Sequence, residues 1–181
     1  MKNKRNFLLL SCLFIATAFQ SCLKDVTPPI TNSEDTHNII EFGDTGPIKS
    51  PSGAVFPLYL PELAGFVNDT AGFYVNVSYS GADKAPTNID VKLTADPAAI
   101  DAYNKEQGTT YVALPAQSYG FPESTTFEKG FNGAKHLRAF IKNGASLKKG
   151  VDYAIALKIE SASSGTISGN FGTAIYGFTL E

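Results

Sequence analysis

Apolar and polar residues alternate in many segments of this chain beyond residue 37, with the period of two that is typical of half-buried β-strands. The clearest case is the segment at residues 72–80. Its predicted inward face consists of Phe73, Val75, Val77 and Tyr79. Similar patterns predict strands at residues 38–42, 89–95, 124–128, 135–142, 152–160 and 173–180. In the segment at 152–160 the predicted inward residues are Tyr153, Ile155, Leu157 and Ile159, while Asp152 and Lys158 face water.

One segment carries helical signals instead. Asp96 is a predicted helix N-cap, Pro97 suits the first helical position because no amide proton is needed there, and Gly108 suits a left-handed C-cap. We therefore expect a helix at residues 97–107. The spacing of its residues predicts a buried face of Ala99, Ile100 and Tyr103 and a solvent face of Asp101, Asn104 and Lys105.

The predicted strands are joined by turns rich in glycine and proline. The extended segment at residues 55–60 contains Pro57, which cannot donate a hydrogen bond to a neighbouring strand, so we expect an edge strand or a bulge there. Many short strands with tight turns and a single helix favour an all-β fold, an antiparallel β-sandwich with one short helix inserted between strands.

The first residues have the order of a lipoprotein signal peptide. Basic residues are followed by an apolar run at residues 7–19, and the Ser21-Cys22 junction resembles a bacterial lipobox. Cys12 is the competing lipobox, but cleavage there would leave a much shorter apolar run, so we expect the lipid on Cys22. The run is also too short for a permanent membrane span, which needs about 20 residues. The predicted organisation is a signal peptide at 1–21, a polar, proline-bearing tether at 22–37 and one sandwich domain at 38–181.

Charge and cysteine content exclude several classes of function. After cleavage the chain has 12 Lys and Arg against 17 Asp and Glu, a net charge of −5, and no basic stripe that would attract nucleic acid. Cys22 would be the only remaining cysteine and would carry the lipid, so no disulfide framework or thiolate metal site is expected. The Lys24-Asp25 pair partly resembles the signal that sends lipoproteins to the outer face of the outer membrane, which favours surface display.

The sequence lacks the motifs of an enzyme. Serine elbows, paired-histidine zinc motifs, phosphate-binding glycine loops and calcium loops are absent, and the mature chain has two histidines, His37 and His136. Asp101 and Glu106 are the nearest carboxylates in a regular element, and their helical spacing is more typical of a solvated face. We expect no catalytic residue, no cofactor and no metal.

A candidate ligand face lies on the polar sides of two predicted strands. Carbohydrates stack the apolar face of a sugar on aromatic rings, and four residues could form such a surface: Tyr74, His136, Arg138 and Phe140. The alternative interpretation, which we favour, is that the helix covers this face, with Ile100 and Tyr103 packed on Phe140. A separate hypothesis concerns Thr70, because Asp69-Thr70-Ala71 resembles the O-glycosylation sequon of exported Bacteroidetes proteins and is predicted to lie in a turn at residues 68–72.

Several segments together resemble a known family. They are Asn38-Ile-Ile-Glu-Phe, Pro57-Leu-Tyr, the helical stretch at 91–104, Gly108-Thr-Thr-Tyr-Val-Ala-Leu-Pro, Asp152-Tyr-Ala-Ile-Ala-Leu-Lys-Ile and Ile167-Ser-Gly-Asn-Phe-Gly-Thr-Ala-Ile-Tyr. The combination is similar to an uncharacterised Bacteroidetes surface-lipoprotein domain that occurs alone or ahead of lectin-like modules and family-18 glycoside hydrolases. The resemblance runs from about Asn38 to Glu181 and implies an immunoglobulin-like sandwich in a setting of glycan capture, with any catalytic domain on another chain.

Two functions remain open at this point. The first is a non-catalytic accessory lipoprotein of the outer membrane that takes part in glycan capture or utilisation. The second is a structural or protein-interaction module in an outer-membrane complex. An exposed cluster of three or more aromatic rings would favour the first, and a long uncovered edge strand would favour the second.

Overall fold

The computed structural model describes residues 38–43, 46 and 48–180. The chain divides into two units, Met1–Asp35 and Thr36–Glu181, and the description below concerns the second. The predicted signal peptide, the lipid site Cys22 and the tether with His37 lie outside the described residues. In the described ranges, no helix has the length and apolar character needed to cross a membrane.

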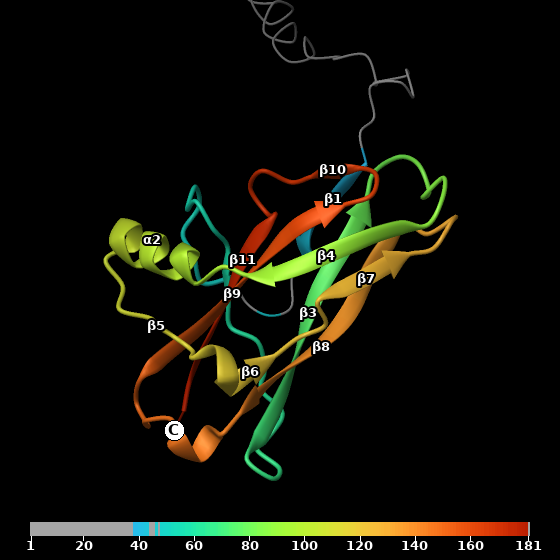
Figure 1. The fold of residues 1–181 in the computed structure, drawn as a ribbon. Coiled ribbons are helices and arrows are strands. Elements are labelled where there is room, and N and C mark those ends of the chain that lie inside the picture. Colours follow the sequence, from blue (N-terminus) through green and yellow to red (C-terminus); the bar gives the residue numbers. More distant parts are fainter. Residues whose placement is uncertain (1–37, 44–45, 47, 181) are drawn as a thin grey trace, which may run out of the picture. The chain divides into compact units, whose positions relative to one another are not determined.

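Two β-sheets stack face to face and form a sandwich (Figure 1). The strands are β1 (Ile39–Gly43), β2 (Leu58–Tyr59), β3 (Thr70–Ser80), β4 (Ile89–Ala95), β5 (Val112–Ala113), β6 (Tyr119–Gly120), β7 (Ser124–Phe127), β8 (Gly133–Lys142), β9 (Asp152–Ala162), β10 (Thr166–Ile167) and β11 (Thr173–Thr179). The helical elements are α2 (Pro97–Gln107) and the 3₁₀ turns η1 (Ala116–Ser118) and η2 (Gly144–Ser146). All the strands predicted from alternation are present, which confirms the sandwich.

The first sheet, sheet A, has the strand order β10-β1-β3-β8-β6, and the second, sheet B, has the order β2-β11-β9-β4-β7 with β5 beside β9. The long neighbours pair antiparallel, whereas β1 with β10, β2 with β11 and β5 with β9 pair parallel over two residues each. As predicted for the segment around Pro57, β2 lies at the edge of its sheet. Pro57 has no N–H, but its carbonyl accepts a hydrogen bond from Ile175 N at 2.9 Å.

The main core lies between the two sheets and contains the predicted inward sets. Phe73, Val75, Val77 and Tyr79 of β3 are each at most 2% exposed. The inward residues of β9 are buried opposite them, and Asp152 and Lys158 are exposed as predicted. At the centre of this core Tyr176 contacts three aromatic rings, those of Phe42, Tyr59 and Phe73.

The helix α2 forms between the expected signals, with Pro97 in its first turn and Gly108 in the left-handed conformation (φ 65°, ψ 28°). Asp96 occupies the N-cap position, but its side chain makes no capping hydrogen bond. Ala99, Ile100 and Tyr103 are the buried residues of the helix, as predicted. Their partners are not on sheet A, however, and the predicted contact of Ile100 and Tyr103 with Phe140 is wrong.

The helix instead covers the outer face of sheet B, beside β9 and β11 (Figure 1). The residues beneath it are Leu58, Ala154, Ala156 and Ile175. The physical reason is that Ala154 and Ala156 fill the positions between the inward residues of β9, so this strand is apolar on both faces and needs a second cover. Sheet A presents His136 and Arg138 on its outer face, which water can solvate.

Asn104 departs from the predicted solvent face of the helix. It is half-buried rather than solvent-facing, and its amide binds three groups just beyond the helix. Its Nδ2 donates to the carbonyl of Tyr111 at 2.8 Å, and its Oδ1 accepts from Thr109 Oγ1 at 2.8 Å and from Tyr111 N at 2.9 Å. Asn104 follows Ile100 by four residues and therefore borders the buried face of the helix.

Candidate functional site

The structure places the four residues of the predicted ligand face together on the outer side of sheet A. Tyr74 lies directly opposite Arg138 in the β3–β8 ladder, and His136 lies opposite Asn76, whose Oδ1 is hydrogen-bonded to Nδ1 of the histidine. Tyr74 is 59% exposed. The four side chains thus share one face, while their role in binding stays a prediction.

The two rings of this face differ in accessibility. Phe140 is half-buried, and its ring lies where a side chain on Gly120 would have to be, with ring atoms 2.5 Å from the position of a built Cβ. The Lys142 ammonium lies 4.9 Å from the centre of the same ring. Among the four predicted residues only Tyr74 therefore offers an open ring, which is fewer than the three rings that would favour a stacking platform.

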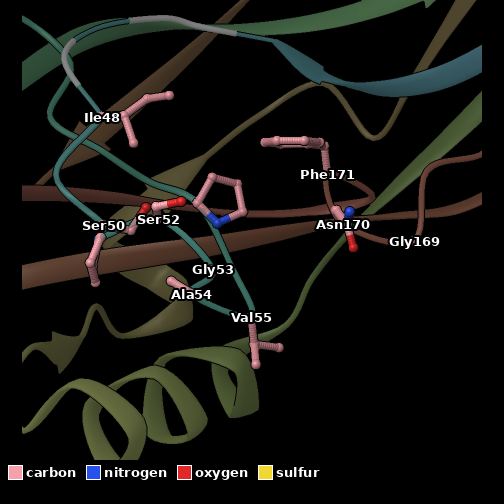
Figure 2. A pocket seen from close by; sticks show the side chains of 11 residues that line it. Ile48, Ser50, Ser52, Gly53, Ala54, Val55, Gly169, Asn170 and Phe171 are labelled. Atoms are coloured by element: carbon pink, nitrogen blue, oxygen red, sulfur yellow. The ribbon is translucent and has the colours of Figure 1, made fainter. Parts of the chain in front are cut away.

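A cleft that the sequence did not predict lies beside the edge strand β2 of sheet B. Its walls are the segment at residues 48–57 and the loop at residues 169–171 between β10 and β11, and its volume is about 570 Å³. The Phe171 ring points into this cleft, Asn170 lies beside it, and Ile48 lies across from it (Figure 2). The cleft has the size of small-molecule binding sites in proteins.

Backbone hydrogen bonds hold Phe171 in place. Its carbonyl accepts from Phe42 N at 2.8 Å and its N–H donates to Ser168 Oγ at 3.1 Å. The next residue, Gly172, lies so close to the Ser168 carbonyl that a Cβ would stand 2.4 Å from that oxygen. The ring is therefore presented by a fixed loop, and little conformational entropy is lost when a ligand stacks on it.

The opposite wall is fixed in a similar way. Residues 51–54 form a turn closed by Ala54 N donating to the Pro51 carbonyl at 3.2 Å, with Gly53 at φ 87°, a conformation that β-turns of type II require at this position. Ser50 Oγ accepts from Leu58 N at 3.2 Å. Val55 N donates to the Glu106 carboxylate at 3.3 Å, so the rim of the cleft is also attached to α2.

The lining combines exposed apolar surface with hydrogen-bonding groups. Phe171 is 38% exposed, Ile48 52% and Val55 58%. Ser50, Ser52 and Asn170 supply hydroxyl and amide groups beside them. An aromatic ring with neighbouring hydroxyls and an amide suits a ligand that has one apolar face and many hydroxyls, as sugars do. The sequence feature that could have pointed to this cleft is the aromatic residue in a glycine-flanked loop, Gly169-Asn170-Phe171-Gly172.

Thr70, the predicted glycosylation site, does not line this cleft. Thr70 is exposed, but it is the first residue of β3 rather than part of the turn. The turn itself consists of Asn68 and Asp69, both with positive φ (49° and 61°), and it is closed by hydrogen bonds between Val67 and Thr70. Among the described residues, no group of three or more His, Cys, Asp or Glu side chains is arranged to hold a metal ion.

Comparison with known proteins gives a family and a shared fold. A family model described as an N-terminal domain matches residues 60–166, more than half of the chain. No curated protein matches the sequence.

Among solved structures, a Bacteroides ovatus protein provisionally described as carbohydrate-binding is 17% identical, with a TM-score of 0.61 over 78% of this chain and 36% of that protein. A multidomain Bacteroides ovatus protein that includes DUF1735 is also 17% identical, with a TM-score of 0.58 over 76% of this chain and 43% of its own. EndoBT-3987 of Bacteroides thetaiotamicron, solved with a Man5GlcNAc product, is 23% identical, with a TM-score of 0.54 over 62% of this chain and 26% of the enzyme. The chain spans less than half the length of each of these proteins, and at these identities the likeness shows a common fold.

Proposed function

We propose a function on the basis of the family match. This chain belongs to the family of N-terminal domains whose model matches residues 60–166. We infer that it is a non-catalytic accessory module that binds glycans at the cell surface. The structural relatives described as carbohydrate-binding and as an endoglycosidase product complex make a glycan-related setting the natural one for this fold.

The observation that carries the proposal is the cleft around Phe171. A ring that is 38% exposed and fixed through its backbone is a stacking surface, and the cleft adds Ser50, Ser52 and Asn170 as partners for hydroxyl groups. Buried or partly buried aromatic rings with a few polar groups are the usual means by which pockets orient small polar ligands. Binding of a glycan in this way requires no general acid, base or nucleophile.

The experiment is a glycan array followed by titration of the purified chain with the glycans that bind. Phe171→Ala should weaken binding by about 5- to 30-fold, since one stacked ring is worth roughly 1–2 kcal/mol. Phe66→Ala is the matched control, because Phe66 is also exposed (41%) but lies outside the cleft. Tyr74→Ala tests the predicted face of sheet A. Loss of binding in Tyr74→Ala alone would move the site to that face, and an array without any binding would refute the glycan proposal.

We further propose that the module is anchored in the outer membrane by a lipid on Cys22 and faces the cell exterior. The order of basic, apolar and small residues before Cys22 supports this. Mass spectrometry of the native protein should find an acylated N-terminus at Cys22, and Cys22→Ala should leave the membrane fraction. A variant that stays fully membrane-bound would contradict the anchor.

Thr70 is proposed as an O-glycosylation site. It is exposed at the end of a hairpin, where an enzyme can reach it, and it stands in the Asp69-Thr70-Ala71 sequence. A peptide of unmodified mass from the native host would rule this modification out.

The alternative, a protein-interaction module, has one observation in its favour. β6 pairs with β8 only at Phe140 and Ile141, so residues 133–139 of β8 have a ladder partner on one side only within the described part of the chain. A partner strand could add to such an edge. Lys135 lies there, however, and its ammonium binds the Thr126 carbonyl and the Glu128 carboxylate, and a charged residue on an edge strand opposes strand addition.

A further inference from the structure

A second cleft lies on the outer face of sheet B, where α2 no longer covers it. Its volume is about 440 Å³, and an apolar wall is formed by Leu60, Pro61 and Leu63. Four residues bring functional groups to it: Lys49, Tyr111, Asp152 and Thr179. The segment at residues 48–50 borders both clefts, because Ile48 and Ser50 line the first and Lys49 lines the second.

Asp152 and Thr179 form the acceptor side of this cleft. The two residues are direct partners in the β9–β11 ladder, and the Thr179 hydroxyl donates to Oδ1 of Asp152. Both residues are exposed. An ionised carboxylate only accepts hydrogen bonds, and it can bind two donors on each oxygen, so Asp152 retains acceptor capacity for the hydroxyls of a ligand.

Tyr111 forms a rigid side wall. The Asn104 amide holds its backbone N–H and carbonyl, and its ring rests against Gly177, where a Cβ would stand 3.1 Å from a ring carbon. Burial, and then the Asp152 charge, raise the pKa of the Tyr111 phenol, which keeps it a neutral hydrogen-bond donor. The residue therefore offers a fixed ring face and one hydroxyl.

Lys49 is the cation of the cleft. Its backbone is fixed by a hydrogen bond from its N–H to the Leu58 carbonyl at 2.8 Å, while its side chain is exposed. Its ammonium has no ion-pair partner within 4 Å among the described residues. Lys49 and Asp152 both line the cleft without forming an ion pair with each other, so the ammonium can pair with an anionic group of a ligand.

We propose that this second cleft binds the carboxylate-bearing sugar unit, a hexuronic acid, of an acidic glycan; this rests on the proposed function and names the class of glycan. The ligand carboxylate pairs with Lys49, the ring hydroxyls donate to Asp152, and the apolar face of the sugar lies on Tyr111. The Asp152 carboxylate would repel phosphate and sulfate esters, whose negatively charged oxygens point in several directions. A neutral sugar would leave Lys49 without a partner.

The test compares short oligogalacturonides with galacto-oligosaccharides of equal length by calorimetry on the purified full chain. We expect the acidic ligand to bind about tenfold more tightly, the effect of one charge-assisted hydrogen bond, and to lose this advantage as salt is raised. Lys49→Gln should remove the preference and leave binding of the neutral ligand unchanged. Lys105→Gln, which removes an exposed lysine of α2 outside the cleft, should leave both affinities unchanged. Thermal melts verify that each variant is folded.

Two kinds of failure are separable. If the chain binds neutral glycans through Phe171 but shows no preference for the acidic ligand, or if Lys49→Gln keeps the preference, the inference is wrong and the proposed function stands. If no glycan binds at all, both are wrong. Binding of a free amino acid, such as leucine, in place of the uronate would also overturn the inference, because Lys49 and Asp152 would then hold a zwitterion.

Discussion

Replacing Tyr176 by phenylalanine removes one oxygen atom from the centre of the core, and we expect the protein to become more stable. Tyr176 is 0% exposed and lies among Phe42, Tyr59 and Phe73, with ring centroids 5.8 to 6.4 Å away. Its hydroxyl has no hydrogen-bond partner among the described residues. In the unfolded chain the same hydroxyl is hydrated, so folding loses its hydrogen bonds to water without replacement.

The magnitude follows from the cost of such a group. A buried polar group without a partner costs about 1–3 kcal/mol, and the lost packing of one oxygen offsets a fraction of the gain, so Tyr176→Phe should raise the free energy of unfolding by about 1–2 kcal/mol. For a domain of this size the melting temperature should rise by roughly 2–8 °C. Urea titration should show a higher midpoint with an unchanged slope.

Tyr79→Phe is the matched control, because the chemical change and the burial are the same. Tyr79 is 2% exposed, and its hydroxyl accepts a hydrogen bond from the Asn38 amide. This variant should lose about 0.5–1.5 kcal/mol. If Tyr176→Phe destabilised the protein as much as Tyr79→Phe does, the Tyr176 hydroxyl would be satisfied after all, by an internal water molecule, and the reasoning would be refuted.

The same hydroxyl predicts a change at alkaline pH. Burial, and to a lesser extent Tyr59, raise the pKa of Tyr176 well above its ordinary value of about 10. Above that pH the unfolded chain ionises Tyr176 while the folded chain does not, so the stability that is present below pH 10 is lost as the pH rises further. Tyr176→Phe should lose less stability than the wild type between about pH 10 and pH 11, measured by urea titration.

Tyr103→Ala should cost about 3 kcal/mol, because Tyr103 of α2 is buried against sheet B, while Lys105→Ala should leave the melt unchanged; equal, negligible shifts would mean that the helix is peripheral. Asn104→Ala should cost about 2 kcal/mol through three lost hydrogen bonds to the chain beyond the helix, and an unaltered melting temperature would contradict this. Gly120→Ala should cost about 1–3 kcal/mol, because the Phe140 ring occupies the space of a Cβ, and adding Phe140→Leu should restore part of that loss in a double-mutant cycle.

Local signals in the sequence were sufficient for the longer strands and for the helix. The alternation in β3 and the end signals of α2, Pro97 and Gly108, depend only on residues close in the sequence. They predicted the bounds of these elements to within two residues. The location of α2 depends on a distant strand. The sequence of β9 did indicate that its outer face is covered, because Ala154 and Ala156 occupy the positions that would be polar in a half-buried strand.

The clefts could not be predicted by the same means. The first brings residues 48–57 against residues 169–171, which are more than a hundred positions apart, and β2 and β10 are two residues long, too short to show a period. The half-burial of Phe140 on the predicted ligand face could not be predicted for a similar reason. The close approach of Gly120 to Phe140 depends on a strand pairing that no local pattern reveals.

The segment at residues 48–63 contributes less to the ladders of the sandwich than the long strands do, because only Leu58 and Tyr59 belong to a strand. It supplies Leu58 and Tyr59 to the interior, while most of its other residues line one cleft or the other. Changes at its cleft-lining positions outside residues 57–59 would leave the ladders of the long strands intact. Paralogues could therefore diversify what they recognise by exchanging this one stretch, in the way that antibody domains exchange their hypervariable loops on an unchanged framework.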